Sequence, residues 1–406
     1  MSVRFCDARP GCPALPAAGV GVFLALMPPL MVIAPSPTGV LAPLYALIFL
    51  GRYWRHLPLE RLRQAPACRA LILVTLWGVA SALWACNPSM AATKALAFVA
   101  VSLPLLVLAL LPQVSGATLA AKSFVGGLCV AAVLLAGQTY GDVLLRSGLP
   151  GAREVVAAIK INVPAAALAI SCWLLPQASA GLSRPWRRAA GAALLLVGCA
   201  VFAGDGSAPR LGFVIGGLTL GLAWLRPRAA MVLLVSGVLL AHLGAPLLGP
   251  SEFGQKVFQP LSWRHRMDIW QLAGELIIER PLLGYGFGNS GEIPARAGVL
   301  PLSQRRAAMP LYPHNVPLQA QLELGVLGVV AFYSCLGYLL QCLWRLPRAV
   351  QTTGVALLAA ALSVWCVGYP LWRATWIAWL YVTAVAFQAT RQGWGQRAAI
   401  APGPKV

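Results

Sequence analysis

A single histidine, His314, stands directly before a long apolar stretch of the chain. Imidazole can take up or release a proton near neutral pH, so this residue is a candidate general base. The polar segment that precedes it contains Arg264 and Arg266, and guanidinium groups bind phosphate through paired hydrogen bonds. A histidine and arginines of this kind suit the transfer of a group whose leaving partner is a phosphate.

The residues after His314 predict how the histidine is presented. Asn315 suits a helix N-cap and Pro317 a first helical turn, so a helix should begin directly after His314. The positive end of that helix and the nearby arginines both disfavour an imidazolium, which favours the neutral ring that accepts a proton. The alternative is a histidine at headgroup level that is bonded to a backbone carbonyl. Asn315 itself is a candidate substrate contact.

Two further polar residues, Gln319 and Glu323, follow one helical turn apart inside the apolar stretch. Ionisable residues within a membrane are functional candidates by default, and we predict that both contact substrate. Glu323 could orient His314 or pair with an arginine. It could equally serve to position a neighbouring helix.

Arg210 begins another apolar run, on a face of the protein that is poor in basic residues. We expect it to contact an anion, although arginines at helix ends also extend towards the headgroups without a ligand. Lys160 and Arg153 are further candidate anion contacts. Arg264 could instead be solvated, and Arg266 could pair with a nearby carboxylate.

Membrane helices must position these residues, because the composition excludes a soluble fold. The 406 residues are 59% hydrophobic and only 10% charged, whereas soluble domains carry about 25% charged residues. Apolar runs of membrane-spanning length recur along the chain. We predict one all-α transmembrane domain, residues 1–406, with about twelve spans: 17–34, 40–53, 70–84, 91–111, 119–138, 161–175, 189–203, 211–225, 229–248, 316–340, 353–367 and 374–389.

The distribution of basic residues predicts the orientation. With a cytoplasmic N-terminus, 18 of the 31 lysines and arginines fall on the cytoplasmic side, in short loops and tails, and six fall in the short connections opposite. Basic residues in short loops favour the cytoplasm, so both termini should be cytoplasmic. The net charge of +20 is thus mostly a topology signal, and no soluble basic module for nucleic acid is present.

One long excursion, residues 249–313, falls on the opposite side, between the ninth and tenth spans. Apolar residues at helical spacing predict a short helix over 262–279, with Ser262 as its N-cap, lying over the mouth of the bundle. A glycine-rich turn follows at 281–289 and contains Tyr285, another candidate substrate contact. The ten cysteines form no CxxC motif and suit apolar packing; we predict no metal site.

Several of these segments together resemble the O-antigen ligase and polymerase superfamily. They are Arg266-x-x-x-Trp270, the run Pro281-Leu-Leu-Gly-Tyr-Gly-Phe-Gly288, and His314-Asn315 followed by Gly325-Val-Leu-Gly328. The interval from His314 to Gly325 is similar to the His-x10-Gly spacing of O-antigen ligases. Ser207-x-x-Arg210 resembles the arginine motif that precedes the loop in those enzymes, although Pro209 departs from the usual small or polar neighbour.

The resemblance implies a glycosyltransferase of the bacterial inner membrane that needs neither metal nor nucleotide cofactor. Its donor would be O-antigen on undecaprenyl diphosphate, its acceptor the lipid A–core oligosaccharide, and its active site would face the periplasm among membrane lipids. His314 matches the family histidine, Arg210 the arginine before the loop and Arg266 the loop arginine. Direct displacement would invert the anomeric carbon.

Three other functions remain open. A polymerase of the same superfamily, or a protein-glycosylating relative, would use the same donor with a different acceptor. The His-x10-Gly spacing and the single long loop favour a ligase over a polymerase. A transporter or flippase could also hold a lipid-linked anion with these basic residues, but no repeated halves are visible in the sequence.

Overall fold

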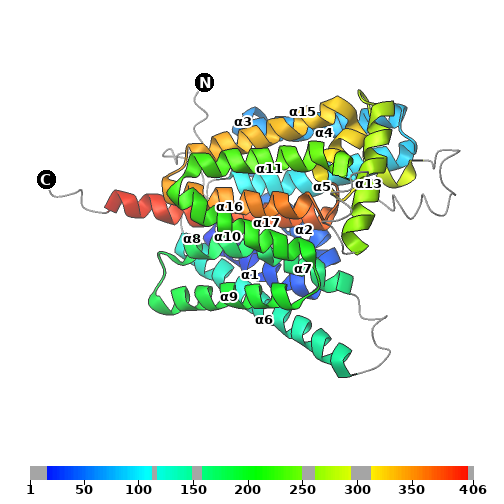
Figure 1. The fold of residues 1–406 in the computed structure, drawn as a ribbon. Coiled ribbons are helices and arrows are strands. Elements are labelled where there is room, and N and C mark those ends of the chain that lie inside the picture. Colours follow the sequence, from blue (N-terminus) through cyan, green and yellow to red (C-terminus); the bar gives the residue numbers. More distant parts are fainter. Residues whose placement is uncertain (1–15, 112–116, 149–157, 249–260, 294–311, 401–406) are drawn as a thin grey trace.

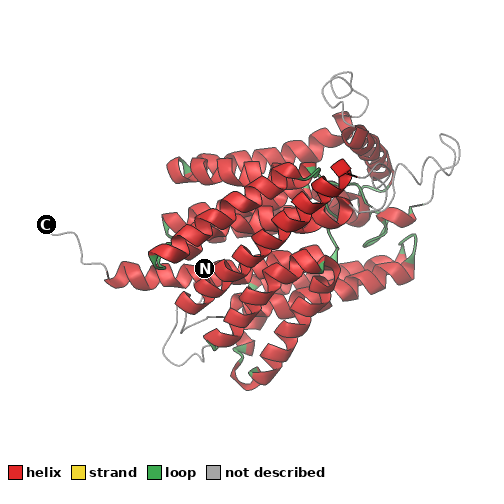
Figure 2. Ribbon diagram, turned by 90° about the horizontal axis from the view of Figure 1, so that it is seen from below, coloured by secondary structure: helices red, strands yellow, loops and turns green. Residues whose placement is uncertain are grey.

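Long α-helices lying roughly side by side form the body of the protein (Figure 1). The structure is a computed structural model that describes residues 16–111, 117–148, 158–248, 261–293 and 312–400. Within those ranges the secondary structure is helical, joined by turns, with no strand (Figure 2). The α-helices are α1 (Ala17–Ile33), α2 (Pro35–Arg52), α3 (Leu59–Gln64), α4 (Pro66–Ala80), α5 (Pro88–Leu110), α6 (Ala117–Gly148), α7 (Ala158–Ser171), α8 (Leu175–Ser179), α9 (Arg184–Ala203), α10 (Ser207–Leu225), α11 (Pro227–Leu248), α13 (Leu261–Glu279), α15 (Val316–Trp344), α16 (Arg348–Trp365) and α17 (Ala374–Ile400).

Each of the twelve apolar runs predicted from the sequence is helical, and the run 161–175 continues from α7 through a short 3-10 turn into α8, which confirms an all-α, multi-pass membrane architecture. Eight of the described helical segments are long and apolar enough to cross a bilayer on length and composition alone. The other four predicted spans correspond to α1, α2, α16 and α17, which pack into the same bundle. That these four helices also cross the membrane, which would make twelve spans in total, remains a prediction.

The centre of the bundle is α7 with the 3-10 turn and α8 that continue it: the segment Ile161–Ser179 is 83% buried, against 11–56% for the other seven candidate spans. Its run Ala165–Ala169 is buried and lets neighbouring backbones approach closely, as small residues do between membrane helices. Trp379 of α17 donates from Nε1 to the Ala167 carbonyl at 2.8 Å. This central packing fixes the register of α7 against α17.

Helix α13 lies across one end of the bundle, transverse to the long helices (Figure 1). It packs against α11 and α15 through a cluster of apolar residues that includes Trp270, Ile269 and Leu322. The prediction of a helix that ends at 279 is confirmed. Ser262 lies inside the first turn and is not the N-cap, because the helix already begins at Leu261.

The glycine-rich run 281–288 lies against a break in α15. At Gly325 the backbone leaves the helix, with φ 62° and ψ −152°, a conformation available essentially only to glycine. The opened backbone groups pair with the run instead: Tyr285 N donates to Leu322 O at 3.0 Å, and Val326 N to Pro281 O at 2.9 Å. The two glycine motifs of the sequence are therefore one structural unit.

Replacing Gly325 with Ala should destabilise this unit. An added Cβ would lie 2.1 Å from the Leu282 carbonyl oxygen and would also suffer the strained φ, so we expect a loss of about 3 kcal/mol or more. Gly337→Ala is the matched control on the same helix, because its Cβ would meet nothing within 4 Å. Thermal unfolding of both variants in detergent, followed by tryptophan fluorescence, tests the prediction; equal melting temperatures would contradict it.

Candidate active site

His314 lies at the start of α15, at the end of the bundle that α13 crosses. The predicted N-cap is confirmed, since Asn315 Oδ1 accepts a hydrogen bond from Leu318 N at 3.2 Å. Asn315 also donates from Nδ2 to the Ala241 carbonyl of α11 at 2.8 Å. His314 has a φ of 54°, which is uncommon for a residue other than glycine. The chain is thus turned sharply immediately before the helix.

A backbone carbonyl binds the imidazole. His314 Nδ1 lies 2.7 Å from the carbonyl oxygen of Gly368, in the turn between α16 and α17. A carbonyl oxygen can only accept, so Nδ1 carries the proton and the lone pair of the neutral ring is on Nε2. The alternative prediction, a histidine bonded to a backbone carbonyl, is correct about this hydrogen bond. The same bond also sets the tautomer that a general base requires.

Helix α13 is fastened to this region by Trp270. Its Nε1 donates to the carbonyl oxygen of Pro313, the residue before His314, at 2.8 Å. One turn earlier, the Arg266 guanidinium lies 5.3 Å from the centre of the Trp263 ring. The spacing Arg266-x-x-x-Trp270 therefore couples the position of a guanidinium to that of the histidine.

The surroundings of Arg266 place it beside the histidine. Burial lowers the pKa of its guanidinium, while Tyr312 and Tyr369 act in the opposite direction. The Tyr312 ring in turn packs against the His314 ring, with centroids 4.3 Å apart. Arginine keeps its charge at neutral pH even when its pKa is lowered, so a permanent positive charge neighbours the imidazole.

Trp270→Phe should reduce turnover by about tenfold, because small displacements of a catalytic group are costly. The variant keeps the ring packing but loses the hydrogen bond to Pro313. Trp379→Phe is a matched control, since it deletes an equally short indole bond in the bundle centre. Rates and melting temperatures of both should be compared. Equal rate losses for the two variants would contradict a specific coupling to His314.

Arg210 approaches the same turn from α10. A Cβ added at Gly368 would lie 3.1 Å from the Ala208 Cβ, so the start of α10 packs against the turn that holds His314. Arg210 Nη2 donates to the carbonyls of Phe202, at 3.1 Å, and Gly204, at the end of α9. Its Nε is buried without an acceptor among the described residues. The guanidinium is therefore held in place with donor capacity left for a ligand.

The sequence analysis missed the turn over residues 366–373, which joins these parts. The Tyr369 hydroxyl donates to Asn162 O of α7 at 2.8 Å, and Leu371 N donates to Gln319 Oε1 at 2.9 Å. Arg373 ends the turn, close enough to Tyr312 and Tyr369 to influence both phenols. A signal for Arg373 existed: it is basic and lies in a short connection on the face that the predicted topology leaves poor in basic residues, as Arg210 does.

A family model described as O-Antigen ligase matches residues 192–333. That segment contains Arg210, Arg266, His314 and Gly325. This part of the chain is similar to the O-antigen ligase family. Arg373 lies beyond the matched segment.

Curated proteins similar to this chain come from Rickettsia species. The "Putative polysaccharide ligase" of Rickettsia prowazekii (strain Madrid E) is 33% identical over 189 residues, which cover 43% of this chain and 45% of the relative. A protein of the same name from Rickettsia conorii (strain ATCC VR-613 / Malish 7) is 30% identical, over 43% and 44%. The chain thus matches slightly less than half the length of these relatives.

Glu323 connects several segments at this end of the bundle through hydrogen bonds. It is fully buried and accepts from Gly288 N at 2.6 Å, Gln319 Nε2 at 2.9 Å and Ser290 N at 3.4 Å, and from Ser290 Oγ and Trp372 Nε1. Of the alternatives left open by the sequence, these bonds favour positioning. The carboxylate joins the glycine-rich run, α15 and the turn that holds His314.

Tyr285 is buried, and its hydroxyl donates to Glu279 Oε2 at 2.9 Å. Burial, with Glu279, raises its pKa to about 12, so the phenol stays protonated at neutral pH. Its polar atom is engaged within the protein, as are those of Asn315. Arg153 lies outside the described residues. Lys160 and Arg264 belong to the first turns of α7 and α13, but their side chains also lie outside the described part.

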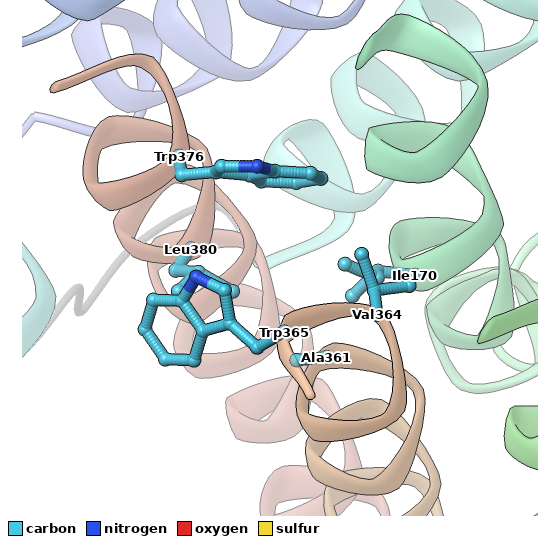
Figure 3. A pocket seen from close by; sticks show the side chains of 6 residues that line it. All are labelled: Ile170, Ala361, Val364, Trp365, Trp376 and Leu380. Atoms are coloured by element: carbon cyan, nitrogen blue, oxygen red, sulfur yellow. The ribbon is translucent and has the colours of Figure 1, made fainter. Parts of the chain in front are cut away.

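A recess too small to admit a water molecule lies between α7, α16 and α17, lined by apolar side chains (Figure 3). Its lining residues are Ile170, Ala361, Val364, Trp365, Trp376 and Leu380. Trp376 also packs edge-on against Tyr369, with ring centroids 4.2 Å apart. The recess lies beneath the turn and offers no charged group, so the candidate site is the polar cluster around His314.

Among the described residues, no three histidine, cysteine or acidic side chains group as metal ligands.

Proposed function

We propose that the protein transfers O-antigen polysaccharide from undecaprenyl diphosphate to the lipid A–core oligosaccharide. The observation that carries this proposal is the tautomer of His314: the Gly368 carbonyl binds Nδ1, so the lone pair that accepts a proton is on Nε2. The neighbouring guanidinium of Arg266 and the anchored one of Arg210 supply positive charge for a leaving diphosphate. The family match over this segment supports the same enzyme class.

In the proposed reaction, an acceptor hydroxyl attacks the anomeric carbon of the donor while His314 Nε2 takes up the hydroxyl proton. The new carbon–oxygen bond forms as the bond to the diphosphate breaks, and that electron pair leaves with the diphosphate. Arg266 and Arg210 stabilise the growing charge more strongly in the transition state than in the ground state. A single displacement inverts the anomeric carbon. The leaving group is already good, so neither metal nor nucleotide enters the scheme.

The orientation follows the distribution of basic residues. Cytoplasmic termini place the His314 end of the bundle, with α13, on the periplasmic side of the inner membrane. Both lipid-linked substrates would then reach the site from the bilayer.

Reconstitution tests the function directly. The purified protein, in nanodiscs with lipid-linked O-antigen, lipid A–core and EDTA, should form full-length lipopolysaccharide without nucleotide. Glycan that lengthens in the absence of lipid A–core would identify a polymerase. Movement of lipid-linked glycan across liposomes without a new glycosidic bond would identify a transporter. Either result would overturn the ligase proposal.

A further inference from the structure

Arg373 has no role in the function proposed above, yet its position is unusual. Its carbonyl oxygen accepts from Trp376 N at 2.9 Å and Ile377 N at 3.1 Å, so Arg373 is the N-cap residue of α17. A positive charge at the positive end of a helix is unfavourable for the helix. Asparagine, aspartate and serine are the residues that favour this position. The stability of α17 therefore gives no reason for an arginine here.

The protein also supplies little to balance the charge of Arg373. Within the described residues, no carboxylate pairs with its half-buried guanidinium. Among the described residues, Glu323 is fully buried and is bonded to Trp372, the neighbour of Arg373 in the chain, but it also accepts hydrogen bonds from Gly288, Ser290 and Gln319. A half-buried cation without a counter-ion among the described residues is suited to an anionic ligand.

Arg373 shares its neighbours with Arg266. Burial raises the pKa of the Tyr312 phenol, and the charges of Arg373 and Arg266 both oppose that rise. The same two arginines act on Tyr369, where burial again has the larger effect. Two guanidinium groups therefore lie near the same pair of tyrosines, and their mutual repulsion is relieved if an anion binds with them.

This pair of arginines is tied to the candidate base on both sides. Tyr312 packs on His314 with ring centroids 4.3 Å apart, and Gly368, in the same turn as Arg373, holds His314 Nδ1 at 2.7 Å. Trp270 fastens the helix of Arg266 to Pro313. Any anion held by Arg373 and Arg266 would consequently lie beside the imidazole.

We propose that Arg373, together with Arg266, binds the diphosphate of the lipid-linked donor. This inference rests on the proposed function and adds a residue from outside the segment that the family model matches. A diphosphate carries at least two negative charges and several acceptor oxygens, which suits two guanidinium groups. A group that holds the donor before and during the reaction changes the affinity for the donor more than it changes turnover.

The test measures binding of radiolabelled undecaprenyl diphosphate to the full-length protein in nanodiscs, without acceptor. Arg373→Ala should weaken binding by about tenfold to a hundredfold, as expected for a lost charged hydrogen bond. Arg373→Lys should fall between, because it keeps the charge and loses the paired geometry. Arg280→Ala is the control: it removes an exposed charge from the end of α13 that stacks on Tyr285 and does not act on Tyr312 or Tyr369. It should bind within about twofold of the unaltered protein.

The outcomes separate this inference from the function. Binding by Arg373→Ala and Arg373→Lys that equals that of the unaltered protein would overturn the role of Arg373, even if the protein ligates. An altered KM for lipid A–core with unchanged donor binding would overturn it as well, because the arginine would then serve the acceptor. Arg373-dependent binding in a protein that forms no lipopolysaccharide would support the anion site and reject the ligase. Melting temperatures show whether each variant is folded. If Arg373→Ala is not folded, the binding measured for Arg373→Lys decides the result.

Discussion

Replacing His314 with Asn should reduce the turnover number by about a hundredfold to ten-thousandfold, the range for removal of a general base. Asparagine cannot accept the proton from the acceptor hydroxyl at neutral pH. Asparagine is a more informative replacement than alanine, because His314 has a φ of 54° and asparagine tolerates that region well. A loss of rate by His314→Asn is therefore not explained by backbone strain. Turnover in the reconstituted assay, with donor binding measured in parallel, is the readout.

A second histidine provides the control for this experiment. His242 is buried, with Nδ1 3.0 Å from the Tyr333 hydroxyl and Nε2 2.8 Å from Gln321 Oε1, between α11 and α15. His242→Asn should lower the melting temperature, since buried polar partners lose bonds at about 1–3 kcal/mol each. Its turnover should stay within a few-fold of the unaltered protein. Full ligation by a correctly inserted His314→Asn variant would remove the base from the proposed mechanism.

Replacing Glu323 with Ala should cause the largest loss of stability among the polar residues at this end of the bundle. The change leaves Gly288 N, the Ser290 hydroxyl, the Gln319 amide and the Trp372 indole without their shared acceptor in a buried place. Unsatisfied buried donors cost about 1–3 kcal/mol each, so a loss of at least about 3 kcal/mol is expected after local relaxation. Thermal unfolding in detergent measures it.

Activity should fall with that stability, because the turn that holds His314 is attached to Glu323 through Trp372. Ser290→Ala is the matched control: it removes one donor and leaves the carboxylate its other bonds, so only about 1 kcal/mol should be lost. Glu323→Gln separates structure from chemistry. A Glu323→Gln variant that melts like the unaltered protein but has lost ligation would show that the carboxylate takes part in the reaction and is not only a clamp.

Local interactions explain what could be predicted from the sequence. The apolar runs give the helices because a bilayer requires internal hydrogen bonding over a fixed length. The Asn315 cap and the end of α13 at Glu279 depend on neighbouring residues only, and both are confirmed. The first residue of α13 was wrong by one position, as is usual for helix ends, which fray.

The importance of the turn over 366–373 could not be read from its own residues. Gly368 matters because its carbonyl meets His314, 54 positions earlier, and Trp372 because its indole meets Glu323, 49 positions earlier. Nothing in the local pattern specifies such a meeting; it depends on how α15, α16 and α17 pack. Arg373 carried a weak signal in its charge and its predicted side of the membrane, but its neighbour Tyr312 comes from a distant segment of the chain.

By itself, the sequence determined a helical membrane protein with a histidine at the start of a helix, arginines on the same face and two glycine motifs in a fixed order. Hydrophobic periodicity, helix capping and the distribution of charge between loops depend on residues that are close together in the chain, so they can be recognised in the sequence. Only the tertiary structure decided which nitrogen of His314 carries the proton, that Glu323 serves as a clamp, and that the two glycine motifs fit into one another at Gly325. Those outcomes depend on single hydrogen bonds between distant segments, and the packing of the whole bundle sets their geometry.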